Sequence, residues 1–427
     1  MQQPIIEQVS KSNFARRAIL QLGQKLVTLP SYGVELGKQI DFKTMLENNL
    51  GNFEHINFVS GPLSKLGDII SEKETRRDLK NSTGEFVEKK YLDLREKIWF
   101  MDSFCDALYY ASFEAGLKDF SRFSKEVRDF LSTITQSNYA SKFRDLKDDT
   151  SLYMKFIREV VQEQVNYRMD FVTPPVPLIF NDSPNYLVDI WFDMIKTTAI
   201  LADTKADKPS SVYLTVHSNN FKKPEVLNLV LGKLFDEATE QDISHIKFVV
   251  LKVIDEGALE TETAGMRLRY RQFITDLSMY CSNTNRTLIM LDSNSLGLTS
   301  ISLGVDAFIE PLNGVTGIGF RKSKDKHGRF YHPEGLKFDG YNDINELYKN
   351  TGSLPCNCKF CSVVKVKDLN DLGYPTWWSL RRSHLAAARN EEVKEFHEAI
   401  EQGIITNAIT DKIQRSDVKN YLDFLPK

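Results

Sequence analysis

Short apolar runs recur along the chain and alternate with segments of helical pattern. Most of the runs are rich in β-branched residues, which is typical of strands that are buried on both faces of a parallel sheet. The predicted strands are Lys25–Val34, His55–Ser60, Lys97–Asp102, Asp170–Phe180, Val212–His217, Ile246–Ile254, Thr287–Asp292 and Val305–Glu310. Between them, Pro184–Ala202 and Pro224–Thr239 are predicted helices, and Asp182-Ser183-Pro184 supplies a cap with proline in the first turn of the former.

Eight strands that alternate with helices predict an α/β fold, namely a (β/α)8 TIM-like barrel. Helical insertions at about 64–94 and 120–167 depart from the minimal barrel, and the strands end near Glu310. We therefore expect a barrel over residues 1–312 and a C-terminal extension, 313–427, that packs on it and ends in a charged helical segment. The alternative is an open doubly wound sheet, but no glycine-rich phosphate loop follows the first strand.

Composition narrows the class of protein. The 427 residues are 41% hydrophobic and 26% charged, with a formal net charge of −3, which excludes a disordered chain and a strongly basic nucleic-acid coat protein. No apolar run approaches the roughly 18 residues of a membrane span, and the N-terminus lacks the pattern of a secretion signal. Three of the five cysteines lie within Cys356–Cys361, which does not suit a disulfide framework. We therefore expect a cytoplasmic protein.

The cysteine cluster is the most specific chemical motif. Cys356, Cys358 and Cys361 lie in a polar loop, and three thiolates this close together can converge on one tetrahedral ion that needs a fourth ligand. His384, 23 positions after Cys361, is the expected fourth ligand, and His397 on the same predicted helix is the alternative. Four protein ligands predict a structural zinc ion (Zn2+) that holds the extension and does no chemistry. A reactive or accidental cysteine cluster is the other reading.

The spacing C-x-C-x-x-C with a downstream histidine, placed after eight predicted strands, resembles the tRNA-guanine transglycosylase superfamily. Three further segments carry the resemblance, which extends from about residue 25 to 400. The last strand, Gly304-Val305-Asp306-Ala307-Phe308-Ile309, is similar to the family's G-V-D-x-F-D, and the third strand ends in Asp102-Ser103-Phe104, similar to D-S-G-G-F. Gly328-Arg329-Phe330-Tyr331 and then Leu354-Pro355-Cys356 follow in the family's order.

The resemblance implies a pentosyltransferase. In these enzymes an aspartate attacks the anomeric carbon of a guanosine, guanine leaves, and a 7-deazaguanine base attacks the covalent glycosyl-enzyme intermediate. The resemblance further implies that Asp102, at the end of the third strand, is the acid/base for the bases that leave and enter, with Ser103 and Phe104 in the substrate site. A simple strand-capping role is the alternative for Asp102.

The expected nucleophile departs from the family pattern. Ile309 occupies the position of the family's aspartate, and an alkyl side chain cannot attack a sugar. Glu310 is adjacent, although strand alternation turns it to the other face unless the strand is bulged, and Asp292 ends the seventh strand at the same end of the barrel. Asp292, Glu310 and loss of the nucleophile therefore stay open.

Other positions in the expected pocket also differ from the family. His217 stands where a glutamine is expected, and it either binds a purine edge or is a strand-end histidine satisfied by the backbone. Val250-Leu251-Lys252 replaces the G-G-L of the sixth strand. With these departures from the family pattern, the sequence resembles the divergent branch of the superfamily that puts 7-deazaguanine into DNA within a modification-restriction system. The expected function is thus guanine exchange in DNA; the alternatives are a catalytically silent zinc-barrel subunit that binds nucleic acid or an active partner, and guanine exchange in tRNA.

The densest basic segment of the chain follows the last predicted strand. Its cationic residues are Arg321, Lys322, Lys324, Lys326 and Arg329, and Arg381 and Arg382 would extend the patch. Phosphate contact is one reading and ordinary solvated surface is the other. Trp377-Trp378 either stacks on a base or packs the extension onto the barrel. The expected partners are DNA or tRNA, a 7-deazaguanine base and a second protein of a modification system.

Overall fold

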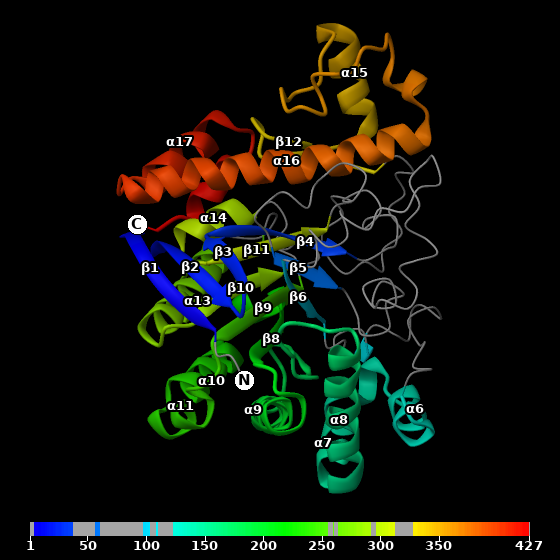
Figure 1. The fold of residues 1–427 in the computed structure, drawn as a ribbon, viewed down its shortest axis with the longest axis vertical. Coiled ribbons are helices and arrows are strands. Elements are labelled where there is room, and N and C mark those ends of the chain that lie inside the picture. Colours follow the sequence, from blue (N-terminus) through cyan, green and yellow to red (C-terminus); the bar gives the residue numbers. More distant parts are fainter. Residues whose placement is uncertain are drawn as a thin grey trace.

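Eight parallel strands form one sheet at the centre of the molecule (Figure 1). The computed structural model describes residues 4–36, 56–59, 97–102, 108–109, 123–254, 259, 264–291, 296–311 and 328–426. The strands of this sheet are β4 (Ser31–Leu36), β5 (Ile56–Val59), β6 (Ile98–Met101), β7 (Leu178–Ile179), β8 (Ser211–His217), β9 (Phe248–Ile254), β10 (Thr287–Leu291) and β11 (Ala307–Pro311). Each overlaps one of the eight predicted runs, which confirms the α/β class.

The order of the strands in the sheet shows that the sheet is curled. The order is β6-β5-β4-β11-β10-β9-β8-β7, so the last strand along the chain, β11, pairs with the first, β4. In a flat sheet β6 and β9 would lie five positions apart, about 24 Å at about 4.8 Å per strand. Yet Asp102, which follows β6, lies 2.6 Å from the Nζ of Lys252 in β9. The side chains of distant strands therefore meet inside the curl.

The two ends of the curled sheet approach each other at the segment before β7. The backbone N–H of Asp170 donates to the carbonyl of Trp99 in β6 at 2.8 Å. Phe171 stacks on Phe100 of β6 with centroids 4.7 Å apart and on Phe248 of β9 at 4.2 Å, which fills the interior with aromatic rings. Direct pairing between β6 and β7 is not among the strand pairs of the described residues.

Helices flank the sheet on its outer side. The described α-helices are α6 (Lys125–Ser132), α7 (Tyr139–Asp148), α8 (Thr150–Asn166), α9 (Asn185–Leu201), α10 (Glu225–Phe235), α11 (Glu237–Ile243), α13 (Ala264–Asn283), α14 (Gly297–Ser302), α15 (Tyr341–Thr351), α16 (Tyr374–Glu401) and α17 (Ile405–Arg415). Helix α9 confirms the first predicted helix. The second predicted helix is divided at Asp236, whose carboxylate accepts a hydrogen bond from the N–H of Thr239 and so begins α11.

The predicted insertion at 120–167 contains α6, α7 and α8, and the one at 64–94 lies outside the described residues. Within the described ranges, none of the helices combines the length and the apolar character that a membrane span requires.

A small antiparallel sheet precedes the parallel one, and the apolar pattern did not predict it. Its strands are β1 (Ile5–Ser12), β2 (Ala15–Leu22) and β3 (Lys25–Leu29), in the order β1-β2-β3. The predicted strand Lys25–Val34 is therefore two strands, β3 and β4, that belong to different sheets. Pro30 separates them, and it has no backbone N–H to donate to a strand ladder.

Two ion pairs, one buried and one partly buried, hold this small sheet against the amino end of the parallel one. Lys25 pairs with Asp170 at 2.5 Å, and Arg16 pairs with Asp306 at 2.8 Å. Asp170 lies in the segment leading to β7, and Asp306 directly precedes β11. The carboxyl end, where the functional residues of such sheets gather, is left to the connecting loops.

Helix α16 connects two separate cores. Its 28 residues span about 42 Å at 1.5 Å per residue. Val393, Phe396 and Ile400 pack in the core of the parallel sheet, whereas Trp377 belongs to a second core with Phe330 and other residues of a segment that we call the cysteine lobe (residues 328–380). Figure 1 shows α16 running along the sheet, with α15 on its far side. The predicted extension 313–427 is thus divided between the two cores.

Two contacts fix the direction of α16 relative to β11. Near the C-terminal end of the helix, His397 Nε2 lies 2.6 Å from the carbonyl oxygen of Pro30, just before β4. Further toward the N-terminal end, Arg389 contacts Glu310 near the carboxyl end of β11. The helix is therefore antiparallel to the strand. The helical residues before Arg389 extend about 22 Å past the level of Glu310. The cysteine lobe consequently lies beyond the carboxyl end of the sheet.

The contact between α16 and β11 is a buried, two-pronged ion pair. Arg389 Nε and Nη2 donate to the two carboxylate oxygens of Glu310 at 2.9 and 3.0 Å, and both side chains are at most 1% exposed. Arg389 Nη1 also donates to Tyr331 Oη and to Glu392. Burial by itself lowers the pKa of Arg389, but the charge of Glu310 outweighs it and holds that pKa well above its ordinary value. The pair is therefore charged.

We predict that Arg389→Met lowers the free energy of unfolding by about 3–5 kcal/mol, because it leaves the Glu310 carboxylate buried without its counter-charge. Urea denaturation measures the change. Lys394→Met, on an exposed position of the same helix, is the control and should shift stability by less than about 0.5 kcal/mol. Adding Glu310→Gln to Arg389→Met should recover part of the loss. If Arg389→Met by itself were as stable as the wild type, the structural role of the ion pair would be contradicted.

Candidate metal centre and candidate active site

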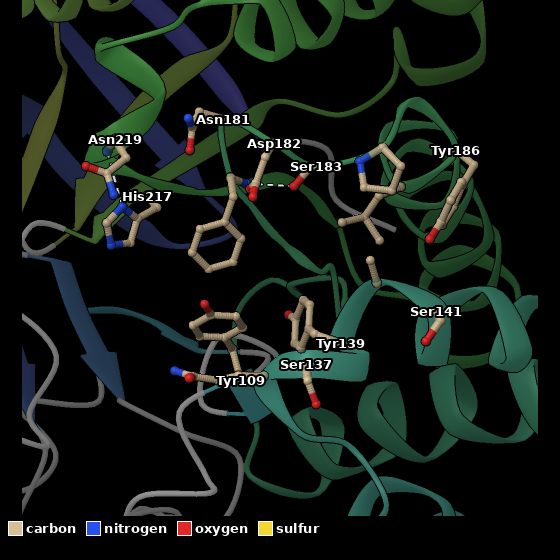
Figure 2. Close-up of a pocket in the computed structure, with 15 residues that line it drawn as sticks. Tyr109, Ser137, Tyr139, Ser141, Asn181, Asp182, Ser183, Tyr186, His217 and Asn219 are labelled. Atoms are coloured by element: carbon tan, nitrogen blue, oxygen red, sulfur yellow. Dashed lines mark hydrogen bonds between the residues drawn. The ribbon is translucent and has the colours of Figure 1, made fainter.

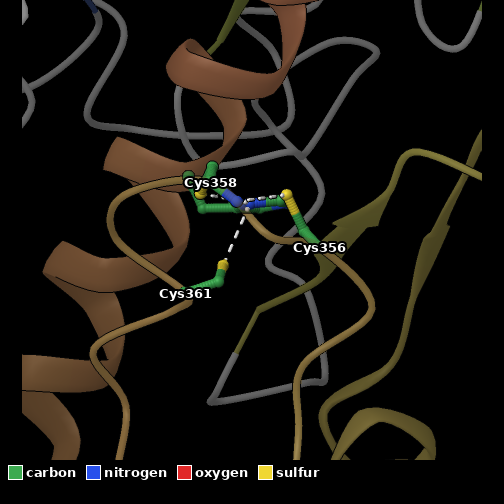
Figure 3. Close-up of side chains that lie close together, drawn as sticks. Cys356, Cys358 and Cys361 are labelled. Carbon is green, nitrogen blue, oxygen red and sulfur yellow. Dashed lines mark hydrogen bonds between the residues drawn. The ribbon is translucent and has the colours of Figure 1, made fainter.

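The three predicted cysteines and His384 converge on one point beside α16 (Figure 3). The ligand atoms of Cys356, Cys358, Cys361 and His384 all lie within 4.8 Å of one another. His384 Nδ1 is 3.5 Å from the sulfur of Cys358 and 3.3 Å from that of Cys361. Around a tetrahedral zinc ion, a sulfur and a nitrogen ligand lie about 3.5 Å apart. The cluster could therefore hold a metal ion such as zinc.

The surroundings of His384 orient it for such a role. Its Nε2 lies 2.7 Å from the carbonyl oxygen of Tyr331, so the N–H at Nε2 donates there and Nδ1 is left to face the sulfurs. Phe330 stacks on the imidazole with centroids 4.2 Å apart. His397, the alternative ligand, instead contacts Pro30 near the opposite end of α16. The choice of His384 over His397 is confirmed.

The charge balance of the cluster also favours a cation. Hydrogen bonds with Cys356 and Cys361 lower the pKa of Cys358, which favours its thiolate form. Hydrogen bonds with Cys356 and Cys358, together with burial, raise the pKa of Cys361. Neighbouring thiolates repel one another when no cation lies between them. A divalent ion would stabilise all three, because the thiolate is the form that binds metal.

We predict that the purified protein carries about one zinc ion per chain, and that Cys358→Ser loses both the metal and the folded cysteine lobe. Elemental analysis gives the metal content, and limited proteolysis reports on the lobe. Cys281→Ser is the matched control, because Cys281 is a buried cysteine outside the cluster. Metal-free wild-type protein with a fully protected lobe would contradict the prediction.

Asp102 lies at the carboxyl end of β6 and faces the interior of the curled sheet. Tyr213 of β8 donates its hydroxyl to Oδ1 at 3.0 Å, and Lys252 of β9 donates to Oδ2 at 2.6 Å. Asp102 and Lys252 are 4% and 8% exposed. A buried carboxylate with a proton donor on each oxygen has the components of a proton-transfer site. Ser103 and Phe104, its predicted neighbours in the site, lie outside the described residues.

The candidate nucleophiles are placed differently. Asp292 lies outside the described residues. Both oxygens of Glu310 are occupied by Arg389, and the side chain is fully buried. Ile309, at the position of the family's aspartate, is buried as well. The ion pair gives Glu310 a structural role and argues against it as an attacking group.

A cavity of about 600 Å³ lies at the carboxyl ends of β7 and β8 (Figure 2). Its aromatic side includes Tyr109, Phe180 and His217. The ring centroids of Tyr109 and Phe180 lie 4.4 Å apart, and those of Phe180 and His217 lie 5.3 Å apart. Its polar side includes Asp182 and Asn219. The Nδ1 of His217 accepts a hydrogen bond from the N–H of Asn219 at 3.1 Å, so the backbone satisfies one ring nitrogen while the ring itself lines the cavity.

The sequence pattern indicated His217 but not the rest of the cavity. Tyr109, Tyr139 and Phe180 come from separate connections that meet only in the folded chain. Asp182 had been interpreted as part of a helix cap. The available signal was position alone, because Phe180 and Asp182 directly follow a predicted strand and the carboxyl ends of parallel strands carry functional groups.

The predicted basic patch requires a correction. Arg381 and Arg382 are at most 2% exposed and lie over the ring of Trp378, so they do not extend an exposed patch. Arg381 also donates to the carbonyl of Arg329 at 3.0 Å. Trp377 is buried against Phe330 in the core of the cysteine lobe, so it packs within the lobe and not onto the parallel sheet. The other predicted phosphate contacts, Arg321, Lys322, Lys324 and Lys326, lie outside the described residues.

Comparison of the sequence with protein-family models and with curated proteins gives no match.

Proposed function

We propose that this protein is a guanine transglycosylase that exchanges a guanine base in DNA for a 7-deazaguanine base. The observation that carries the proposal is the carboxylate of Asp102, buried at the end of β6 with Tyr213 and Lys252 on its two oxygens. A carboxylate at this strand end is what base exchange needs for proton transfer to the departing base. The cysteine cluster follows the last strand in the order that the resemblance implies.

The proposal includes a closed (β/α)8 barrel. The pairing of β11 with β4, the hydrogen bond from Asp170 to Trp99 and the interior ion pair of Asp102 and Lys252 all fit a closed ring. Helix α16, antiparallel to β11, then takes the place of the eighth outer helix. Closure brings the carboxyl ends of all the strands to one face, where a single substrate can reach groups from several of them.

The cavity beside this face fits a base taken out of the helical stack. A nucleic-acid enzyme that acts on the glycosidic bond must flip its nucleotide into a pocket that stacks on the base and reads its edge. Tyr109, Phe180 and His217 offer ring faces, and Asp182 offers a carboxylate that can accept the N–H donors of a guanine edge. A volume of about 600 Å³ is ample for one base with part of its sugar.

In the proposed reaction Asp102 passes a proton to guanine as the glycosidic bond breaks and takes one back from the entering base. The nucleophile stays assigned to a carboxylate at the same strand ends, and Asp292 remains the candidate since Glu310 is engaged by Arg389. Zinc on Cys356, Cys358, Cys361 and His384 would fix the shape of the cysteine lobe and take no part in bond breaking.

The second candidate is a catalytically silent subunit. It is favoured by one specific observation, that Ile309 and the ion-paired Glu310 offer no attacking group on β11. Such a subunit would keep the zinc site and bind nucleic acid or an active partner protein without exchanging base.

Labelled-guanine exchange with DNA and with tRNA separates these candidates. We expect the wild-type protein to exchange guanine in DNA, with an added partner protein if one is needed. Asp102→Asn should lower the rate by about 10² to 10⁴, because it keeps the size of the side chain and removes proton transfer. Asp189→Asn, the same change at an exposed position of α9, is the control and should leave the rate unchanged.

The possible results have distinct meanings. Exchange in tRNA and not in DNA would move the substrate to the other nucleic acid. Binding without exchange on either would favour the silent subunit. Exchange at the wild-type rate by Asp102→Asn would show that another group transfers the proton.

A further inference from the structure

Lys252 is a charged residue on an otherwise apolar strand. Strand β9 reads FVVLKVI, and all seven of its residues are buried. Burying an ammonium group is costly unless a partner compensates it, and here Asp102 does so at 2.6 Å. A strand interior that only had to pack would carry an apolar side chain at this position. The lysine is therefore better explained by what it does for Asp102.

The geometry leaves Asp102 dependent on its neighbours for a proton. Asp102 forms an ion pair with Lys252, and a carboxylate in an ion pair cannot act as an acid until it receives a proton. Within the part of the chain that the structure describes, two donors contact it, the hydroxyl of Tyr213 on Oδ1 and the ammonium of Lys252 on Oδ2. The contact of the ammonium with the carboxylate is the shorter. Proton transfer from the ammonium also leaves two neutral groups, whereas transfer from the hydroxyl would leave a buried phenolate.

We propose that Lys252 supplies the proton that Asp102 delivers to the departing base. This inference rests on the proposed function. As the bond from the sugar to guanine N9 breaks, the sugar carbon forms a bond to the nucleophilic carboxylate. Asp102 receives a proton from Lys252, which becomes a neutral amine, and passes it to guanine. When the entering base bonds to the sugar, the bond from the sugar to the nucleophilic carboxylate breaks, the base loses its N9 proton to Asp102, and Asp102 returns a proton to Lys252, which recovers its charge. The cycle needs no other reactant.

In this scheme Lys252 is a positioning residue, because it acts through Asp102 and need not touch the base. Two other roles are chemically reasonable for a lysine here. It could serve only as a fixed positive charge that holds Asp102 in place, or its amine could itself attack the sugar. The three roles differ in two respects. One is whether the lysine must release its proton, and the other is which substrates lose their base more slowly when the lysine is replaced.

Two variants and two substrates distinguish these roles. Lys252→Arg keeps the charge and the contact but does not release a proton, and Lys252→Met removes both. The DNA substrates contain either guanine or 7-methylguanine at the exchanged position, since 7-methylguanine is already cationic and leaves without being protonated. Base release is measured in a single turnover and expressed relative to the wild type on the same substrate. Lys247→Met, at the half-buried lysine just before β9, is the control.

We expect both Lys252 variants to release guanine at least about 10²-fold more slowly than the wild type, and 7-methylguanine within about fivefold of it. Unchanged zinc content and thermal unfolding would show that the variants are folded. If Lys252→Met does not fold, Lys252→Arg on guanine decides the question by itself. The control should match the wild type on both substrates.

Three results would overturn the inference. Wild-type guanine release by Lys252→Arg would reduce the lysine to a fixed charge. If the Lys252 variants release guanine and 7-methylguanine equally slowly, and borohydride traps a covalent adduct of the wild-type protein, Lys252 would be the nucleophile. A wild-type protein that exchanges no base at all would remove the proposed function and this inference together, whereas active wild type with active Lys252→Arg would remove this inference alone.

Discussion

The ion pair between Arg389 and Glu310 determines where the cysteine lobe lies relative to the strand ends. A bidentate contact between a guanidinium and a carboxylate fixes both the distance and the orientation of the two groups. Because Glu310 is near the carboxyl end of β11 and Arg389 is midway along α16, the first half of the helix must extend past the sheet. That half carries His384, so the position of the cysteine cluster follows from this contact together with the contact of His397 and Pro30 near the other end of the helix.

The charged pairs at the two ends of the sheet have different consequences. At the amino end, Arg16 with Asp306 and Lys25 with Asp170 connect the start of the parallel strands to the small antiparallel sheet. At the carboxyl end, Asp102 and Lys252 meet inside the curl. The first pairs lie at the end that carries no functional groups in folds of this kind, whereas the last pair lies at the end where such folds gather them.

The cysteine cluster and the strand-end carboxylate support the functional proposal in different ways. The cluster depends on spacing within a short loop plus one distant histidine, and such spacing is specific because a tetrahedral ion accepts few arrangements. The carboxylate alone is less specific, since many α/β proteins have an aspartate at a strand end. The support that this carboxylate gives is strengthened by Lys252 and Tyr213, which lie on other strands and contact its two oxygens.

The sequence by itself determined the eight parallel strands and the three clustered cysteines, because both are written in local patterns. Apolar β-branched runs specify buried strands, and Cys356-x-Cys358-x-x-Cys361 brings three thiols close together, whereas the choice of His384 over His397 needed the folded chain. Only the tertiary structure decided the roles of Glu310, Arg381, Lys252 and the residues around the cavity. Their partners lie far away along the chain, 79 residues for Glu310 with Arg389 and 150 for Asp102 with Lys252. No local pattern records such a distance, so the burial and pairing of these charges followed from the way the sheet curls.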